Sequence, residues 1–273
     1  MRTSPFIVWC YFRFKKQIID AFNKKDKNQK ELFDLFNKIK IEAKKDNICT
    51  HPNVSLPVAH SIFCIMGLGA ICELKPNDII DNIEMLLKNK YFNEKNRENS
   101  MTVRNMILEE INTYKNDENK ELSNSDKSFL YFTKGDKSVN THIGFYYHAF
   151  RLTLYYLYYF NEIKEDKIYT KYRTIMNQIC SFGGDTDTNA AIVGAVIGPL
   201  IGFKKFGDND FKKMVNLVPK NRFIFSPALM ILYVYFLKEN NKEKKNMNFL
   251  RMLLNILYEK KDLKDLDNIN SIE

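Results

Sequence analysis

Apolar residues recur every three or four positions along much of this chain, which is the spacing of an amphipathic helix. The pattern is clear over residues 30–44, where Leu32, Leu35, Phe36 and Ile39 would share one face. The segments predicted to be helical are residues 5–22, 30–44, 54–74, 77–88, 103–114, 169–180, 189–203, 227–237 and 249–258. The periodicity therefore predicts a chain built mainly from helices.

Two apolar segments are too long for strands and favour buried helices. The first, residues 54–74, places Pro57 in its first turn, where the missing N–H breaks no helical hydrogen bond. A turn is expected before it, at Asp46-Asn47. The second, residues 141–160, is rich in Phe and Tyr. Its length favours a helix, although aromatic residues also suit strands.

The apolar segment 189–203 contains three glycines spaced four residues apart, Gly194, Gly198 and Gly202. Glycines at this spacing lie on one face of a helix and allow a neighbouring helix to approach closely. A membrane span is the alternative, but the apolar run is about 14–16 residues long and a bilayer needs about 20. We therefore expect a central core helix that is nearly fully buried.

The composition agrees with an all-α fold in a single domain. The chain has 273 residues but only 10 Gly and 7 Pro, and no Pro/Gly/Ser-rich linker divides it. We expect one domain over residues 1–273, folded as an orthogonal multi-helix bundle. Residues 115–127 are rich in Lys, Asn and Glu and are predicted to form a mobile loop.

Charge and cysteine content exclude some functions without identifying one. The net charge of +9 lies largely in Lys/Asn-rich stretches such as 23–30 and 238–245, which are typical of solvated loops. We therefore expect neither direct nucleic-acid binding nor membrane binding. The five cysteines are odd in number and lack CxxC spacing, which favours reduced core residues. No cleavage site follows the apolar run 6–12, so a cytoplasmic location is expected.

The segment from Gly183 to Thr188, GGDTDT, carries the most informative chemistry. Two glycines permit a tight turn, and four oxygen-bearing side chains then crowd the predicted start of a helix. Carboxylates and hydroxyls are hard ligands that suit Mg²⁺ or Mn²⁺. The alternative is helix capping, because Asp and Thr also satisfy the free N–H groups of a first helical turn.

Residues 181–203, SFGGDTDTNAAIVGAVIGPLIGF, are similar along their whole length to the signature of the ADP-ribosylglycohydrolase family. In that family the two aspartates and the last threonine of the motif bind a pair of Mg²⁺ ions. The resemblance implies that Asp185, Asp187 and Thr188 are metal ligands. It also places Gly183, Gly184 and Thr186 beside the substrate.

Three weaker matches occur in the family's order along the chain. Residues 1–5, MRTSP, resemble the latter part of an NGxxMRxxP segment, and residues 49–53, CTHPN, resemble a Ser/Thr-His-Pro element. Residues 143–145, IGF, resemble the start of a substrate-side helix. The resemblance implies that His51, Gly144 and Phe145 line the substrate pocket, and we expect them to converge with the GGDTDT segment on one cleft.

The family's GDAxG and TDDT motifs do not occur in this sequence. We interpret the chain as resembling the carboxy-terminal two-thirds of the family domain, without its first helices and with half of the metal site. The implied activity is Mg²⁺-dependent hydrolysis of the bond between ADP-ribose and a protein side chain or polymer, with Asp185 and Asp187 as catalytic residues. The alternatives are a non-catalytic protein that binds ADP-ribose or a partner protein, and an inactive fragment.

Overall fold

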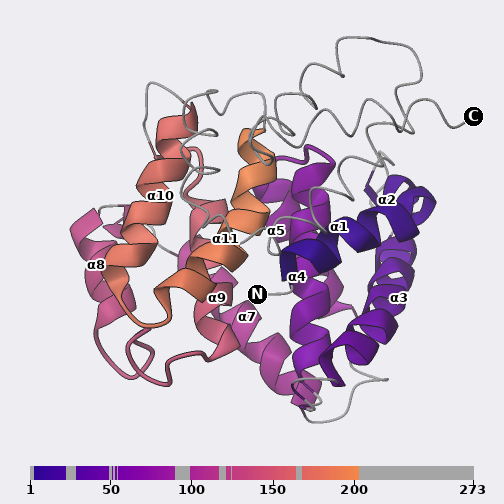
Figure 1. Cartoon of the computed structure of the whole chain (residues 1–273), viewed down its shortest axis with the longest axis horizontal. Coiled ribbons are helices and arrows are strands. Elements are labelled where there is room, and N and C mark those ends of the chain that lie inside the picture. Colours follow the sequence, from indigo (N-terminus) through magenta and orange to yellow (C-terminus); the bar gives the residue numbers. More distant parts are fainter. Residues whose placement is uncertain are drawn as a thin grey trace, which may run out of the picture. The chain divides into compact units, whose positions relative to one another are not determined.

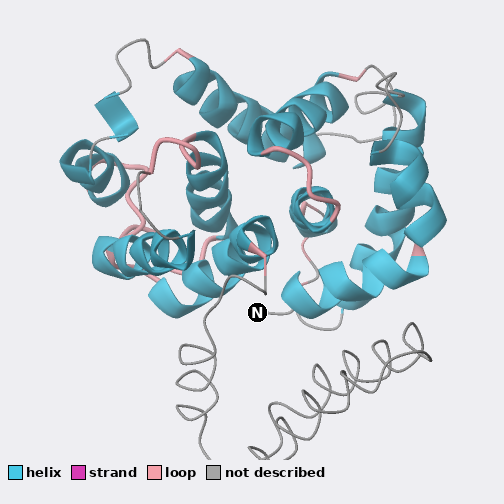
Figure 2. Cartoon of the chain, turned by 90° about the horizontal axis from the view of Figure 1, so that it is seen from above, coloured by secondary structure: helices cyan, strands magenta, loops and turns pink. Residues whose placement is uncertain are grey.

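Every regular element that the computed structural model describes is a helix, as the periodicity predicts (Figure 1). The described residues are 3–22, 29–48, 51, 53, 55–89, 99–116, 121–123, 125–163 and 168–202. Among them are α1 (Thr3–Arg13), α2 (Lys15–Phe22), α3 (Gln29–Ile48), α4 (Leu56–Ile71), α5 (Pro76–Lys88), α7 (Asn99–Lys115), the short 3₁₀ helix η1 (Glu121–Ser123), α8 (Ser125–Thr133), α9 (Tyr146–Tyr158), α10 (Ile168–Phe182) and α11 (Thr186–Ile201). Figure 2 shows these helices joined by loops, and α9 confirms the helical alternative for the aromatic segment.

All described residues belong to one compact unit, residues 1–205. The helices expected at 227–237 and 249–258 lie outside the described residues, as does position 203. Within the predicted loop 115–127, the described residues include the last residue of α7, all of η1 and the start of α8. The mobility of that loop and the single-domain organisation of the whole chain stay predictions.

Two local predictions near the amino terminus are wrong. The expected helix over 5–22 is two helices, because the helical pattern breaks at Phe14 between α1 and α2. The turn expected at Asp46-Asn47 is absent, and α3 continues to Ile48. The reason is tertiary: Asn47 is buried, and its side-chain oxygen lies 3.2 Å from Nδ1 of His60 on α4. Such a partner is invisible to the local turn preference of Asp-Asn.

Helix α4 lies at the centre of the core. All of its residues from Pro57 to Ala70 are buried, and it packs against α1, α3, α5 and α11. Pro57 stands in the first turn as predicted. Gly67 allows α1 to approach closely, because a Cβ built there would lie 2.6 Å from Cδ1 of Ile7. Burial on all sides explains why the sequence of α4 is almost continuously apolar.

Helix α11 is central, as expected, but it is not buried on every side. It packs against α9, α10, α4 and α1. Its buried residues are Asn189, Ile192, Val193, Val196, Ile197 and Ile201. Ala191 is exposed, and Gly194 and Gly198 are half-buried, so the expectation of nearly complete burial is wrong. A helix face of small residues stays partly exposed even after one neighbouring helix has packed against it.

The glycine stripe of α11 serves close packing at one position only. A Cβ built on Gly194 would lie 2.7 Å from the hydroxyl of Tyr172 on α10, whereas Gly202 has nothing within 4 Å. Gly194 is therefore required by helix contact, and Gly202 instead ends α11 with a φ of 81°. No helix in the described residues has the length and hydropathy needed to cross a membrane.

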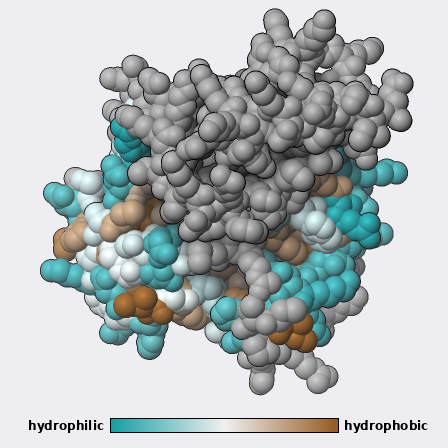
Figure 3. Space-filling view, viewed as in Figure 1, coloured by the Kyte–Doolittle hydropathy of each residue, from teal (hydrophilic) through white to brown (hydrophobic). Residues whose placement is uncertain are grey.

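The cysteines and the surface agree with a protein whose apolar residues lie mainly in its core. Of the cysteines in the described residues, all are free; Cys10 and Cys64 are buried, Cys72 is half-buried, and Cys180 is exposed, contrary to the expected core position. Figure 3 shows hydrophobic residues as small separate areas among hydrophilic ones where the described surface is visible.

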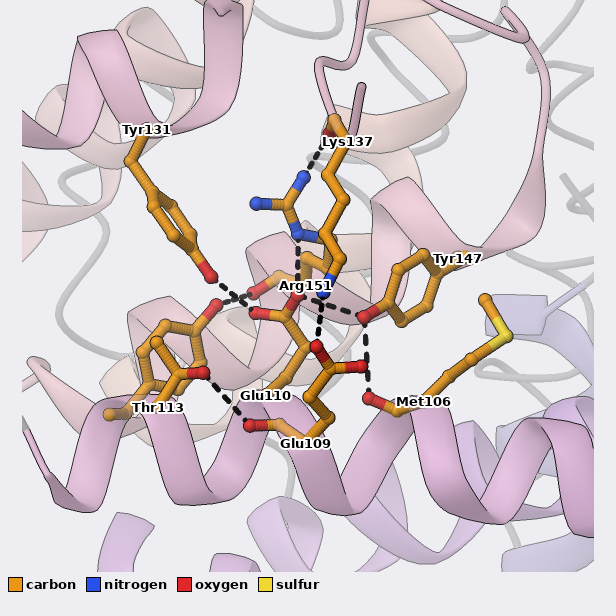
Figure 4. Close-up of polar contacts among 9 residues, drawn as sticks. Met106, Glu109, Glu110, Thr113, Tyr131, Lys137, Tyr147 and Arg151 are labelled. Atoms are coloured by element: carbon orange, nitrogen blue, oxygen red, sulfur yellow. Dashed lines mark hydrogen bonds and ion pairs between the residues drawn. The ribbon is translucent and has the colours of Figure 1, made fainter. Parts of the chain in front are cut away.

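A buried ion pair joins α7 to α9 (Figure 4). Nε of Arg151 lies 2.8 Å from Oε1 of Glu110, and both side chains are 1% exposed. The hydroxyls of Tyr147 and Tyr131 each donate a hydrogen bond to Glu110, at 2.8 Å. Arg151 also donates to the backbone carbonyl of Lys137, in the loop between α8 and α9. Because each charge is paired and hydrogen-bonded, the cost of burying both is compensated.

The protonation states of this network are fixed by its surroundings. Burial and the neighbouring Glu110 carboxylate raise the pKa of Tyr131 to about 12, so its hydroxyl remains a donor at neutral pH. Burial disfavours the charge on Arg151, but Glu110 and the hydroxyls of Tyr114 and Tyr131 outweigh it and raise the pKa of Arg151. The guanidinium also lies 4.7 Å from the ring centre of Tyr131, which adds a cation–π contact.

We predict that Arg151→Met lowers the free energy of unfolding by about 3–5 kcal/mol, because it leaves the Glu110 carboxylate buried without its charge partner. Urea denaturation at pH 7 measures the loss. The matched control is Lys88→Met, which breaks an exposed i,i+4 pair with Glu84 and should cost about 0.2–1 kcal/mol. Equal losses for the two variants would contradict a dominant role for the buried pair.

Candidate functional site

The Gly183-Gly184 turn connects α10 to α11 in a conformation that favours glycine. Gly183 has a φ of 82° and Gly184 a φ of 70°, both in the left-handed region that other residues rarely adopt. Asp185 follows as the N-cap of α11, and Asp187 lies in its first turn. The tight turn predicted from the two glycines is therefore confirmed, and it delivers both aspartates to one end of α11.

The loop between α8 and α9 covers this turn. A Cβ built on Gly183 would lie 2.5 Å from Oδ1 of Asn140, and one built on Gly184 would overlap the backbone carbonyl oxygen of Val139. Nδ2 of Asn140 donates a hydrogen bond to the carbonyl of Phe182 at 3.2 Å. Both glycines are thus favoured by their φ angles, and Gly184 is also required because a backbone carbonyl leaves no room for a side chain. At Gly183 the side chain of Asn140 occupies that space.

The carboxyl group of Asp185 does not cap α11. Asp185 occupies the N-cap position but makes no side-chain capping hydrogen bond. Its Oδ2 lies 3.8 Å from the place where Gly144 would carry a Cβ, so it faces the segment just before α9. Capping, which the sequence left open for both aspartates, therefore does not explain the side chain of Asp185.

Asp187 interacts with Asp185 and is exposed. A hydrogen bond with the Asp185 carboxyl lowers the pKa of Asp187, and the N–H of Thr188 acts in the same direction. The two carboxyl groups are thus within hydrogen-bonding reach of each other, an arrangement that a hard divalent cation would stabilise. Thr186 and Thr188 are half-buried in the same turn of α11. Backbone N–H groups donate hydrogen bonds to the side chain of Asp187, whereas the side chain of Asp185 makes no capping hydrogen bond.

The carboxylates of the turn form a small donor set. In the described residues, no group of three or more His, Cys, Asp or Glu side chains is arranged to hold a metal ion. Asp185 and Asp187 provide two carboxylates, and Thr188 would add a hydroxyl. These hard oxygen donors are of the kind that Mg²⁺ and Mn²⁺ prefer, and a site with this few protein ligands leaves positions for substrate or water.

Gly144 and Phe145 directly precede the first residue of α9, and Gly144 lies beside Asp185. Gly144 has a φ of 85° and borders Asp185, and Phe145 is the N-cap of α9. The Phe145 side chain is 38% exposed, so its ring is accessible to a ligand. The structure therefore brings the Gly144-Phe145 segment and the Gly183–Thr188 segment together, although they are about 40 residues apart in the sequence.

His51 is exposed, and Thr50 lies outside the described residues. The N–H of His51 donates to the carbonyl of Asn47 at 2.7 Å, which keeps this segment close to the end of α3. Burial raises the pKa of Tyr146, the first residue of α9, and a hydrogen bond with Ser55 acts in the opposite direction. The segment that follows His51 therefore reaches the start of α9. Direct contact of His51 with a ligand at Asp185 stays a prediction.

A cavity of about 220 Å³ lies on the α7 side of the same loop. Its lining includes Met106, Glu109, Lys137, Phe145, Tyr147 and His148. Nζ of Lys137 pairs with Oε1 of Glu109 at 2.6 Å, so two of the charges at this cavity compensate each other. Phe145 lines this cavity, but no residue from Gly183 to Thr188 does.

His148 helps to hold the loop between α8 and α9 in place. It is 3% exposed, and its Nε2 lies 2.7 Å from the carbonyl oxygen of Thr141. Burial lowers the pKa of His148, so the ring is neutral at neutral pH and Nε2 can donate to that carbonyl. His142, which follows Thr141, adopts a left-handed φ of 48°, a conformation that is uncommon for residues other than glycine.

A family model described as ADP-ribosylglycohydrolase matches residues 30–212, about two thirds of the chain. No curated protein and no solved structure matches the chain. The matched range includes the carboxylate turn, the Gly144-Phe145 segment and His51. The chain therefore belongs to the ADP-ribosylglycohydrolase family, with the all-α fold that the resemblance implied. Membership implies an ADP-ribosyl hydrolase activity, with ADP-ribosylated molecules as the general class of substrate.

Sequence reasoning missed the residues that hold the site in place. Val139 and Asn140 have no motif of their own, and nothing in the local pattern indicates that they lie against Gly184 and Gly183. The two glycines were the only signal, because a left-handed pair often marks a close backbone approach. They indicated that something packs there but not what it is.

We predict that Gly184→Ala destabilises the fold more than Gly135→Ala by about 1–3 kcal/mol. Both glycines have a left-handed φ, so each substitution costs roughly 1–2 kcal/mol of backbone strain. Only position 184 adds a clash with a backbone carbonyl, since Gly135 has nothing within 4 Å. Chemical denaturation of both variants measures the difference, and equal losses would show that the loop does not hold the turn.

A second prediction concerns pH. Because burial lowers the pKa of His148, the unfolded chain binds its proton more readily, and stability is lost as pH falls below about 6.5. His148→Gln, which keeps a hydrogen-bond donor, should remove up to about 1.4 kcal/mol per pH unit from that slope. Urea midpoints between pH 7 and 5 test this. An unchanged slope in the variant would exclude His148 as the source.

Proposed function

We propose that this chain binds Mg²⁺ or Mn²⁺ through Asp185, Asp187 and Thr188 and hydrolyses the glycosidic bond between ADP-ribose and a protein side chain or a polymer. The observation that carries the proposal is the Asp185 carboxyl group. It lies at a helix start without capping the helix, and it is within hydrogen-bonding reach of a second carboxylate. A divalent cation between the two would relieve their mutual repulsion.

The neighbouring residues suit a sugar phosphate ligand. Gly144 is exposed and lies close to the Asp185 carboxyl group, so a ligand can approach its backbone without meeting a Cβ. The accessible ring of Phe145 offers a flat apolar surface beside that glycine. His51 would contribute a polar group from the α3–α4 connection. These contacts would hold the ribose and its phosphates while the carboxylates face the reacting bond.

The reaction class follows from the donor types. When bound, the cation would orient ribose hydroxyls and stabilise the charge that develops at the anomeric carbon. Asp185 is half-buried and held by the turn, so it is suited to a fixed ligand position. Asp187 is exposed, so one of its carboxylate oxygens would hold the cation while the other accepts a proton from an attacking water. Water would then add to the anomeric carbon as its bond to the acceptor breaks, and the proton taken up by Asp187 would pass to the leaving acceptor group.

One observation favours a second candidate, a non-catalytic protein that binds ADP-ribose. The described residues hold only the small donor set of the turn, with no larger group of metal-binding side chains. A ligand can then be held by the glycine backbone and Phe145 without hydrolysis. Calorimetric titration with ADP-ribose, together with an assay on ADP-ribosylated peptide, separates the two: binding without turnover identifies the second candidate.

We predict that millimolar Mg²⁺ or Mn²⁺ raises the melting temperature and that Asp187→Asn abolishes most of this gain. At ten times the dissociation constant, linkage contributes about 1.4 kcal/mol, or a rise of about 2–6 °C. The matched control is Asp78→Asn, which removes a first-turn carboxylate from α5, outside the GGDTDT segment. Loss of the metal effect in both variants, or in neither, would contradict a metal site at Asp187.

A further inference from the structure

We propose that Asn140 is a positioning residue for this site: it holds the Gly183-Gly184 turn in the conformation that brings Asp185 to Asp187. The role rests on the proposed function, since it concerns the same pair of carboxylates. It goes beyond that function because it assigns a task to a side chain outside the GGDTDT segment. Asn140 lies in the loop between α8 and α9, 45 positions before Asp185 in the sequence.

Both ends of the Asn140 amide contact the turn. Nδ2 donates to the carbonyl of Phe182, the last residue of α10, at 3.2 Å. Helix ends leave such carbonyls without an intrahelical partner, so this bond ties the end of α10 to the loop. Oδ1 lies only 2.5 Å from the place of a Cβ on Gly183. One amide group thus fixes the residue before the turn and closes off the space over its first glycine.

Asn140 is itself held by the end of α8. Its backbone N–H donates to Oγ of Ser138 at 3.1 Å, and that hydroxyl donates to the carbonyl of Thr133 at 2.9 Å. The adjacent Val139 donates its N–H to the carbonyl of Phe132 at 2.8 Å. The side chain of Asn140 therefore extends from a fixed backbone, and it can transmit that position to the turn.

The turn requires such a contact because two adjacent glycines have more accessible conformations than any other pair of residues. Without an external contact, Gly183-Gly184 would place Asp185 in several orientations, and only some would bring its carboxyl to Asp187. Outer-shell partners that orient metal ligands typically contribute 10–100-fold to metal affinity. Asn140 would act in this way, through the backbone rather than through a bond to the ligand itself.

The test is the affinity of the full chain for Mn²⁺, measured by calorimetry well below the melting temperature. Asn140→Ala should weaken binding about 10–100-fold. Asn140→Ser, which keeps a short polar side chain, gives a second, milder variant if the first does not fold. The matched control is Thr141→Val, whose hydroxyl bonds only within the loop, to the carbonyls of Ser138 and Asp136. It should lower the melting temperature and leave the Mn²⁺ affinity unchanged.

A double-mutant cycle on stability tests the contact without any metal. Gly183→Ala should destabilise the unsubstituted chain more than it destabilises Asn140→Ala, because the amide oxygen that the new Cβ would meet is then gone. Additive losses would overturn the claim that Asn140 presses on the turn. This measurement needs neither bound metal nor catalytic activity.

Turnover of ADP-ribosylated peptide supplies a third readout. For Asn140→Ala, kcat should fall at low Mn²⁺ and recover as Mn²⁺ is raised, while KM for the peptide stays constant. If the unsubstituted chain binds Mn²⁺ and Asn140→Ala binds it equally well, the positioning role is overturned and the proposed function stands. If the unsubstituted chain binds no Mn²⁺, the proposed function is overturned, and this role with it.

Discussion

The buried ion pair between Glu110 and Arg151 is the interaction on which the site's geometry depends. Two charges at 1% exposure are costly unless every hydrogen-bonding position near them is used. Here Tyr131 and Tyr147 donate to the carboxylate, and the guanidinium extends to the carbonyl of Lys137. The requirement to satisfy Arg151 thus fixes a point on the loop between α8 and α9, which has no regular structure of its own.

The loop, which is held at Lys137, in turn makes short contacts with the Gly183-Gly184 turn. Val139 and Asn140 follow Lys137 after one residue, Ser138, and lie against Gly184 and Gly183. Further along, Gly144 lies beside the carboxyl group of Asp185. The loop thus meets the turn twice, once on the glycines and once beside the aspartate. Its position decides where Asp185 lies, and α11 contributes the direction in which Asp187 projects.

The groups that hold the site in place are different from those that a ligand would contact. The groups that hold the loop, such as Arg151 and His148, are buried among aromatic side chains. Asp187 and Phe145, which would meet a ligand, are exposed. A fixed backbone with accessible functional groups suits a hydrolase of the ADP-ribosylglycohydrolase family, because the cost of ordering the site is met by folding rather than by substrate binding.

The sequence by itself determined the helices, the diglycine turn and the pairing of two aspartates at a helix start. These features depend on residues close together in the chain, and short-range periods and φ preferences report on them. It did not determine that α3 would run through Asp46-Asn47, that α11 would keep an exposed face, or that Asn140 would lie over Gly183. Each of these depends on contacts between segments that are separated in the sequence, such as Asn47 and His60, which are 13 residues apart. Only the packed structure selects such partners, because burial and hydrogen bonding between distant segments outweigh local preference.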